Sequence, residues 1–237
     1  MKIIRPLLLL LIVPCFLMLL SFLPKSTGAE ESPAGIALAD HSASLFDAAG
    51  LKARGLNYDA FSLALKGKEK LEAEGKIEKT NLITIADFSQ SSCRKRLYVI
   101  DLVQQKILFQ TFVAHGKNSG EEYAQYFSNE PQSNKSSLGF YTTLETYYGE
   151  HGLSLRLKGE EAGINNNAFD RAIVMHGAGY VSQQFVSQNG RLGRSQGCPA
   201  LPAEQCSAII NELKNGSCIF LYYPDKNYLS ESLLLQD

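Results

Sequence analysis

The feature that most restricts the possible folds is a change in the spacing of apolar residues at Asn81. Between residues 36 and 79, apolar side chains recur every three to six positions, which is typical of short amphipathic helices. From residue 82 onward, short runs of apolar and β-branched residues are separated by polar turns, which is typical of strands. This order predicts a mainly β unit that follows a helical segment.

The strand-like half of the chain divides into several expected elements. Strands are expected at residues 82–88, 97–102, 106–114, 139–144, 153–157, 172–175 and 218–223. Gln104 and Gln105 separate the second strand from the third and predict a hairpin turn. A helix is expected at residues 202–214, with Gly216 just beyond its end. Residues 117–137 form a long polar loop, and loops of that length are often functional.

The helical half carries its own start and stop signals. Asn57 or Asp59 is expected to begin a helix, because short polar side chains favour the position before the first helical turn. Glycines are expected to break the segment into short helices, and they stand at Gly50, Gly55, Gly67 and Gly75. The segment therefore predicts a helical N-terminal extension of the β unit.

The composition describes an ordinary globular protein. Hydrophobic residues make up 45% of the 237 residues and charged residues 20%. The formal net charge is −1, so the chain lacks the cationic excess that non-specific nucleic-acid binding requires. No nucleic-acid partner is expected.

The first 29 residues have the order of a secretory signal peptide. Lys2 and Arg5 precede a nearly unbroken apolar run from Leu7 to Leu23, and small residues follow at Thr27 and Ala29. We therefore expect cleavage after residue 29 and export to the periplasm or cell envelope. The alternative is an uncleaved membrane anchor, because the run reaches the lower length limit of a transmembrane helix.

Four cysteines follow this segment, at Cys93, Cys198, Cys206 and Cys218. An even number of cysteines in an exported protein suggests disulfides, and Cys206 with Cys218 is the candidate pair. Cys198 has a different sequence context and is expected to remain a free thiol. The spacing lacks the close cysteine pairs of structural zinc sites, so no metal is expected.

Cys198 and His176 are the candidate catalytic residues. His176 ends an apolar strand and precedes Gly177, so its side chain is expected at the rim of the sheet. Cys198 follows 22 residues later at the expected entry to a helix, where the helix dipole lowers the pKa of a thiol. A cysteine nucleophile needs a base within hydrogen-bond reach, and His176 can supply it. Taken separately, each residue also fits a structural role, as an ordinary histidine or a half-cystine.

The turn that leads into Cys198 is the candidate oxyanion hole. The backbone amides of Gln196, Gly197 and Cys198 are expected to be unpaired near the start of the helix. Such amides can stabilise the oxyanion of a tetrahedral intermediate. Because Gly197 has no side chain, a substrate carbonyl can approach the backbone closely there.

These residues also carry a family resemblance. His176-Gly177 together with Ser195-x-Gly197-Cys198 resembles the active-site signature of the YkuD-type L,D-transpeptidases, which cross-link peptidoglycan. The run from Gly190 to Pro199 is similar to a divergent branch of that family, the murein L,D-transpeptidase catalytic domain proteins. Further similarity lies in segments 113–117 and 137–141 and in the closing helix and strand, so the resemblance extends over about residues 82–222.

The resemblance implies a fold and a division of the chain. It implies a mainly β catalytic domain, a YkuD-like β-sandwich or barrel with a few helices. The implied catalytic domain covers residues 81–225. Residues 30–80 precede it as a tether and helical segment, and residues 226–237 follow it as a C-terminal tail.

The resemblance also implies an activity without a cofactor. Cys198 would attack a peptidoglycan stem peptide to form a thioester, with His176 as the base, held through the Gly177 carbonyl. An amine of a second stem would then resolve the thioester into an L,D cross-link, with no obligate protein partner. Water as the acceptor would give an L,D-carboxypeptidase or hydrolase. A reading of another class is a non-catalytic peptidoglycan-binding envelope protein whose Cys198 is disulfide-bonded.

The chain departs from the commoner family pattern on both sides of the cysteine. Gln196 stands where that pattern has histidine, and Pro199-Ala200 stands where it has isoleucine and arginine. Arg191 and Arg194 are candidates to bind a substrate carboxylate in place of the missing arginine, against the alternative of solvated loop charges. Two further residues, Ser195 and His115, are candidate substrate contacts.

Overall fold

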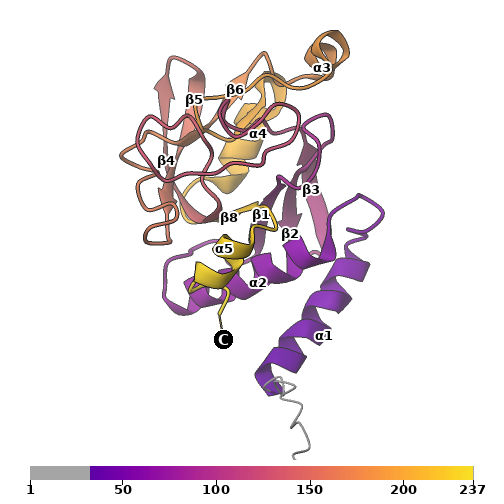
Figure 1. Ribbon diagram of the computed structural model, residues 1–237. Coiled ribbons are helices and arrows are strands. Elements are labelled where there is room, and N and C mark those ends of the chain that lie inside the picture. The colour runs from indigo at the N-terminus through magenta and orange to yellow at the C-terminus, as the bar shows by residue number, and fades with distance from the viewer. Residues whose placement is uncertain (1–32, 237) are drawn as a thin grey trace, which may run out of the picture. The chain divides into compact units, whose positions relative to one another are not determined.

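A computed structural model describes residues 33–236 of the chain (Figure 1). The expected signal peptide, residues 1–29, lies outside the described residues. Over residues 33–236, none of the helices combines the length and the apolar content that crossing a membrane requires.

The described residues contain helices at both ends of the chain and strands between them. The helices are α1 Pro33–Ala48, α2 Tyr58–Ala73, α3 Gln183–Asn189, α4 Ala203–Leu213 and α5 Lys226–Glu231. The first strands are β1 Leu82–Asp87, β2 Leu97–Asp101, β3 Lys106–Thr111 and β4 Gly139–Gly149. The later strands are β5 Gly152–Gly159, β6 Val174–Ala178, β7 Ala200–Pro202 and β8 Cys218–Tyr222.

The strands form one eight-stranded sheet in the order β3-β2-β1-β8-β4-β5-β6-β7. Most neighbours are antiparallel, but β1 with β8 and β6 with β7 are parallel. The two edges of the sheet meet, because Ala114, just beyond β3, donates its amide hydrogen to the carbonyl of Ala200 in β7 at 2.9 Å. The expected mainly β fold is confirmed.

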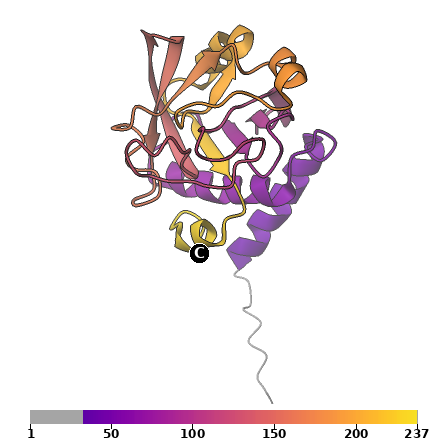
Figure 2. The same ribbon diagram turned by 45° about the horizontal axis from the view of Figure 1, so that its top comes forward.

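Both faces of the sheet are buried at its centre, as the residues of β8 show. Cys218 and Phe220 belong to a core that includes α2, whereas Ile219 and Leu221 belong to a second core that includes α4. Alternate residues of a strand point to opposite faces, so α2 and α4 cover opposite sides of the sheet. Figures 1 and 2 show α2 and α4 on different sides of the strands, with α3 standing out on a long connection.

The helical half differs from the expectation at one glycine. Asn57 begins α2 as expected, because its side chain accepts a hydrogen bond from the Asp59 amide at 2.8 Å. Gly67, however, lies inside α2 and does not end it. A Cβ at this position would lie 2.1 Å from the Phe140 ring, so the glycine lets the helix approach the sheet closely. Glycine is used there for packing and not as a helix break.

The N-terminal helices share a core with the sheet. Phe61 and Leu71 of α2 lie in the same buried cluster as Ile83 of β1 and Phe140 of β4. Tyr228 of α5 is buried in that cluster too. The boundaries expected at residues 80 and 225 therefore fall between elements that pack in one hydrophobic core.

The strands that frame the candidate residues also differ from the expectation. β6 begins two residues later than expected and continues past His176, so His176 is the central residue of this strand. Ala172 adopts a positive φ of 54°, which ends the preceding turn and delays the start of the strand. β7 was not expected, because a three-residue strand that ends in proline has no clear sequence signal.

The four cysteines of the described residues are all free thiols. The expected pairing of Cys206 with Cys218 is wrong, because the two side chains lie in the two cores on opposite faces of the sheet. Burial raises the pKa of Cys206 to about 11 and that of Cys218 to about 12. Cys198 remains unpaired, as expected.

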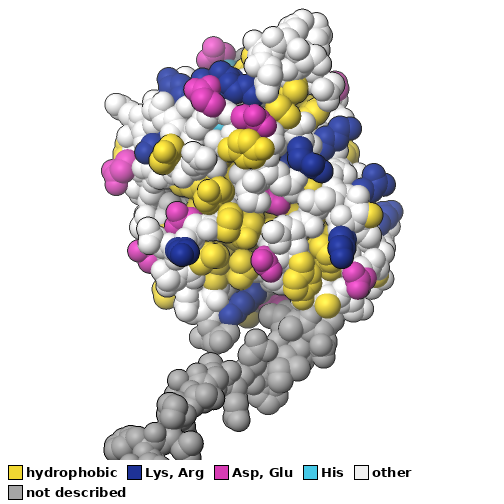
Figure 3. Space-filling view, turned by 45° about the vertical axis from the view of Figure 1, so that its right-hand side comes forward, with side chains coloured by type: hydrophobic (Ala, Val, Ile, Leu, Met, Phe, Trp, Pro, Cys, Tyr) yellow, Lys and Arg dark blue, Asp and Glu magenta, His cyan; other side chains and the backbone are white. Residues whose placement is uncertain are grey.

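One face of the molecule shows how the surface charges are distributed. Figure 3 shows Lys and Arg side chains mixed with Asp and Glu, and hydrophobic side chains interspersed among them.

Candidate active site

Cys198 lies beside β6, the strand that carries His176. β6 and β7 are parallel, and His176 is paired with Ala200, two residues after Cys198. The Val174 amide donates to Cys198 Sγ at 3.5 Å, and Sγ donates to the Ala172 carbonyl at 3.8 Å. The fold therefore brings the two candidate catalytic residues to the same part of the sheet.

His176 is buried and its ring is oriented by the backbone. Its Nδ1 lies 3.0 Å from the Gly177 carbonyl oxygen, the contact that the family resemblance implies. Because a carbonyl oxygen only accepts, Nδ1 carries the hydrogen and Nε2 keeps its lone pair. Burial lowers the pKa of His176, although the hydrogen bond to Gly177 opposes this shift. A neutral imidazole with a free Nε2 is the form that a general base requires.

A second histidine, His151, covers His176. Its ring stacks on the His176 ring with centroids 4.3 Å apart and an angle of 20° between the planes. His151 lies in the turn between β4 and β5, and its proximity contributes to the lowered pKa of His176. Sequence reasoning missed this contact because the two histidines are 25 positions apart and only the pairing of β5 with β6 brings them together.

Cys198 is not at a helix terminus, which corrects the expectation for its pKa. The three residues of β7 stand between it and α4, so the helix dipole does not act on the thiol directly. Burial raises the pKa of Cys198, while the Val174 amide, the charge of Arg171 and the residue's own amide lower it in part. A thiol with a raised pKa stays protonated near neutral pH, so a nucleophilic role for Cys198 would require a base.

The side chain of Ser195 holds the turn that carries Cys198, the candidate nucleophile. Its hydroxyl donates to the Cys198 carbonyl at 2.6 Å and accepts the Gly197 amide hydrogen at 3.0 Å. Gly197 has a φ of 127°, and a Cβ there would lie 2.8 Å from the Lys135 carbonyl oxygen. Glycine is required at this position by both the backbone conformation and the close packing.

The same contacts bear on the candidate oxyanion hole. The Gly197 amide is used within the turn by Ser195. The Cys198 amide lies close enough to its own sulfur to lower the pKa of the thiol. Gln196 is exposed at the outside of the turn. Of the three candidate amides, that of Cys198 is the one that lies near the Cys198 sulfur.

Arg171 is a residue of this site that sequence reasoning missed. Its guanidinium donates to four groups of the 128–137 segment: the Ser128 carbonyl at 2.8 Å, the Ser137 hydroxyl at 2.6 Å, the Ser133 hydroxyl at 3.2 Å and the Lys135 carbonyl at 2.7 Å. It also lies against Gly197, where an added Cβ would be 3.4 Å from its Nη2. Arg171 therefore ties the long loop to the turn that carries Cys198, and no sequence motif marks it.

Arg191 and Arg194 both bind a carboxylate that belongs to the protein itself. Arg191 Nε and Arg194 Nη1 lie 2.9 Å and 2.6 Å from the two oxygens of Glu121. Arg194 also donates to the carbonyls of Lys117 and Gly120. Hydrogen bonding from Arg194 is the largest cause of the lowered pKa of Glu121. In this structure, the two arginines hold the start of the 117–137 loop.

His115 is fully buried and has partners on both ring nitrogens. Arg96 donates to Nδ1 at 2.8 Å, and Nε2 donates to the Gly120 carbonyl at 3.3 Å. Burial, together with the charges of Arg96, Arg194 and Arg191, lowers the pKa of His115 to about 3. His115 is therefore neutral and engaged in the packing of the loop, whereas His176 has a free nitrogen.

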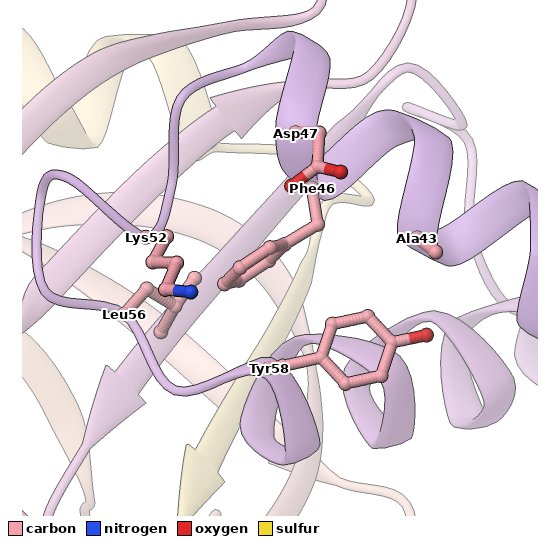
Figure 4. Close-up of a pocket in the computed structure, with 6 residues that line it drawn as sticks. All are labelled: Ala43, Phe46, Asp47, Lys52, Leu56 and Tyr58. Atoms are coloured by element: carbon pink, nitrogen blue, oxygen red, sulfur yellow. The ribbon is translucent and has the colours of Figure 1, made fainter.

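The pocket in Figure 4 lies elsewhere, between α1 and the start of α2. Lys52, Leu56 and Tyr58 surround the Phe46 ring, and Asp47 and Ala43 complete the lining. None of these six residues is a candidate catalytic residue. Across residues 33–236, no three side chains of His, Cys, Asp or Glu gather as a metal ion would require.

Solved structures with similar folds include several L,D-transpeptidases. The chain is 13% identical to an L,D-transpeptidase from Mycobacterium smegmatis, with a TM-score of 0.38 over 60% of this chain and 59% of that one. It is 15% identical to an L,D-transpeptidase from Mycobacterium tuberculosis H37Rv, with a TM-score of 0.36 over 60% and 58%. The chain thus spans about three fifths of the length of these proteins. No curated protein matches the chain.

The family is shown by its sequence model and not by these distant structures. The model described as the L,D-transpeptidase catalytic domain matches residues 52–222, which is most of the chain. The match includes α2, the whole sheet, and both His176 and Cys198. The chain belongs to the L,D-transpeptidase catalytic domain family.

Proposed function

We propose that this protein is an exported cysteine acyltransferase that forms L,D cross-links between peptidoglycan stem peptides through a thioester on Cys198. The observation that carries the proposal is the position of the Cys198 thiol beside β6. Its Sγ accepts a hydrogen bond from the amide of Val174, which is two residues before His176 in that strand. His176 in turn donates from Nδ1 to the Gly177 carbonyl. Family membership supports an action on peptidoglycan in general.

The first half of the proposed reaction forms the thioester. His176 Nε2 takes the thiol proton as Cys198 Sγ attacks the carbonyl carbon of the L-centre of a stem tetrapeptide. The Cys198 amide donates to the oxyanion of the tetrahedral intermediate. The bond to the terminal D-residue then breaks, and His176 returns the proton to the leaving amine.

The second half transfers the acyl group. His176 accepts a proton from the side-chain amine of a neighbouring stem as that amine attacks the thioester. The carbon–sulfur bond breaks, an amide forms, and the thiol is regenerated. If water attacks instead, the same residues release a tripeptide, which is the carboxypeptidase alternative.

Product analysis tests the proposed reaction. The purified protein is incubated with a stem tetrapeptide donor and a second stem that carries a free side-chain amine. We expect loss of the terminal D-residue and a new amide-linked dimer, identified by mass spectrometry. Tripeptide without dimer would favour the hydrolase, and unchanged tetrapeptide would favour a non-catalytic role.

Export is a separate part of the proposal. The basic residues at Lys2 and Arg5, the apolar run Leu7–Leu23 and the small residues after it support cleavage near Glu30. We expect N-terminal sequencing of protein from an envelope fraction to begin near Glu30. An intact Met1 form embedded in the membrane would instead identify an uncleaved anchor.

A further inference from the structure

Arg156 of β5 is brought next to the proposed active site by the register of the sheet. Antiparallel pairing places Ser154 opposite His176 and Arg156 opposite Val174. Residues opposite each other on neighbouring strands point to the same face of a sheet. Arg156 therefore lies on the face that carries His176, directly across from the residue whose amide contacts Cys198 Sγ.

The opposite face is closed by the core. Leu155 and Met175, the alternate residues of the same two strands, are fully buried in the cluster that includes α4. The Arg156 side chain, in contrast, is 38% exposed. The arginine is thus reachable by a ligand that lies along the His176 face.

Two aromatic rings hold the guanidinium of Arg156. Its Cζ lies 4.5 Å from the centroid of the Tyr147 ring and 5.7 Å from that of Phe169. Phe169 is half-exposed, and its carbonyl accepts the amide hydrogen of Ala172, whose own carbonyl contacts Cys198 Sγ. Contact with aromatic faces orients a guanidinium while leaving its edge available for hydrogen bonding.

The hydrogen-bonding capacity of Arg156 is largely unused. Its Nε lies 3.1 Å from Glu145, whose side chain is 65% exposed, and exposed ion pairs of this kind contribute little. Its two terminal amino groups make no hydrogen bond to any residue in the described part of the chain. Arg171, Arg191 and Arg194, the other arginines of this region, differ because each also donates to at least one backbone carbonyl.

We propose that Arg156, oriented by Tyr147 and Phe169, binds a carboxylate of the peptide substrate. The inference rests on the proposed function and identifies a residue that would select stem peptides by their carboxylates. Arg156 and Cys198 flank β6, so their backbones are about two strand spacings, roughly 10 Å, apart. An extended peptide covers that distance in about three residues. The recognised carboxylate therefore belongs to a residue about three positions or fewer from the reacting carbonyl.

A binding measurement that does not depend on turnover tests the inference. The Cys198→Ala protein is titrated by calorimetry with two synthetic stem tetrapeptides. One has free carboxylates, and the other has every carboxylate amidated, including the terminal one. We expect the free acid to bind roughly ten- to a hundredfold more tightly. A charge-assisted, bidentate hydrogen-bonded contact typically changes a dissociation constant by about that factor.

Variants of two basic residues on β5 show which side chain causes the preference for the free-acid peptide. Arg156→Gln in the same background should bind both peptides equally, and Arg156→Lys should restore only part of the preference, because lysine lacks the planar fork. Lys158→Gln is the matched control, since Lys158 lies on the same strand and face, and it should keep the full preference. Circular dichroism verifies that each variant is folded.

The outcomes separate this inference from the proposed function. Equal binding of the two peptides, binding of neither, or a preference that survives Arg156→Gln would overturn the role of Arg156. If the preference is present but the protein with Cys198 intact leaves the tetrapeptide unchanged, the proposed reaction fails while the carboxylate site stands.

Discussion

Replacing Cys198 with serine is expected to reduce turnover of stem tetrapeptides to background. A serine hydroxyl is a far weaker nucleophile at neutral pH than a cysteine sulfur, and His176 has no carboxylate hydrogen-bonded to it among the described residues. The variant should also lose the mass adduct that we expect on the original protein after incubation with a carbapenem, a reagent that would acylate an active thiol. Reaction rate and intact mass are the two measurements.

Cys93→Ser is the matched control for this substitution. Cys93 is partly exposed and donates to the Gly190 carbonyl at 3.2 Å, so it is accessible but lies outside the proposed dyad. It should keep both turnover and the carbapenem adduct. Continued turnover by Cys198→Ser, or loss of the adduct only in Cys93→Ser, would show that Cys198 is not the nucleophile.

Replacing His176 with alanine is expected to lower kcat/KM by roughly 10²- to 10⁴-fold, the usual contribution of a general base. The effect should be large because the pKa of Cys198 is raised and the thiol does not ionise readily on its own. Burial lowers the pKa of His176 below its ordinary value of 6.5, so the neutral base persists as the pH falls through that value. The acid limb of the rate profile is therefore expected below pH 6.5.

His115→Ala distinguishes a catalytic histidine from a structural one. Removing this ring leaves the buried Arg96 without one of its acceptors, which typically costs about 1–3 kcal/mol of folding free energy. The variant should unfold at a lower temperature, but its folded fraction should keep most of its activity. If His115→Ala lost more activity per folded molecule than His176→Ala, the assignment of the base would be reversed.

Most of the strands, and the helix α4, could be predicted because their sequence patterns are local. β1, β2, β3, β8 and α4 lie close to the expected ranges, since each is a run of apolar residues with a clear period and polar flanks. β6 begins and ends later than the sequence predicted. Its limits depend on the turn at Ala172 and on pairing with β7, and neither is visible in the sequence. Long-range pairing decides such boundaries.

The candidate site divides in the same way. Cys198, His176 and the Gly177 contact could be expected from a motif, because these residues recur in a fixed local order. His151, Arg156 and Arg171 could not, because each reaches the site through the register of a strand or through a distant loop. Arg191 and Arg194 were expected to bind a substrate carboxylate, but in the structure both form ion pairs with the carboxylate of Glu121.

The parallel pairing of β1 with β8 has a consequence for how the chain acquires its structure. Ile83 lies beside Cys218, so the centre of the sheet joins residues 135 positions apart. A contact of such high sequence separation requires closure of a long loop before it gives any stabilisation, which slows folding. During synthesis, both hydrophobic cores remain incomplete until β8 has emerged, because β8 contributes residues to each of them. Until then β1 and β4 lack the strand that pairs with both of them, so the sheet is completed only when β8 is present.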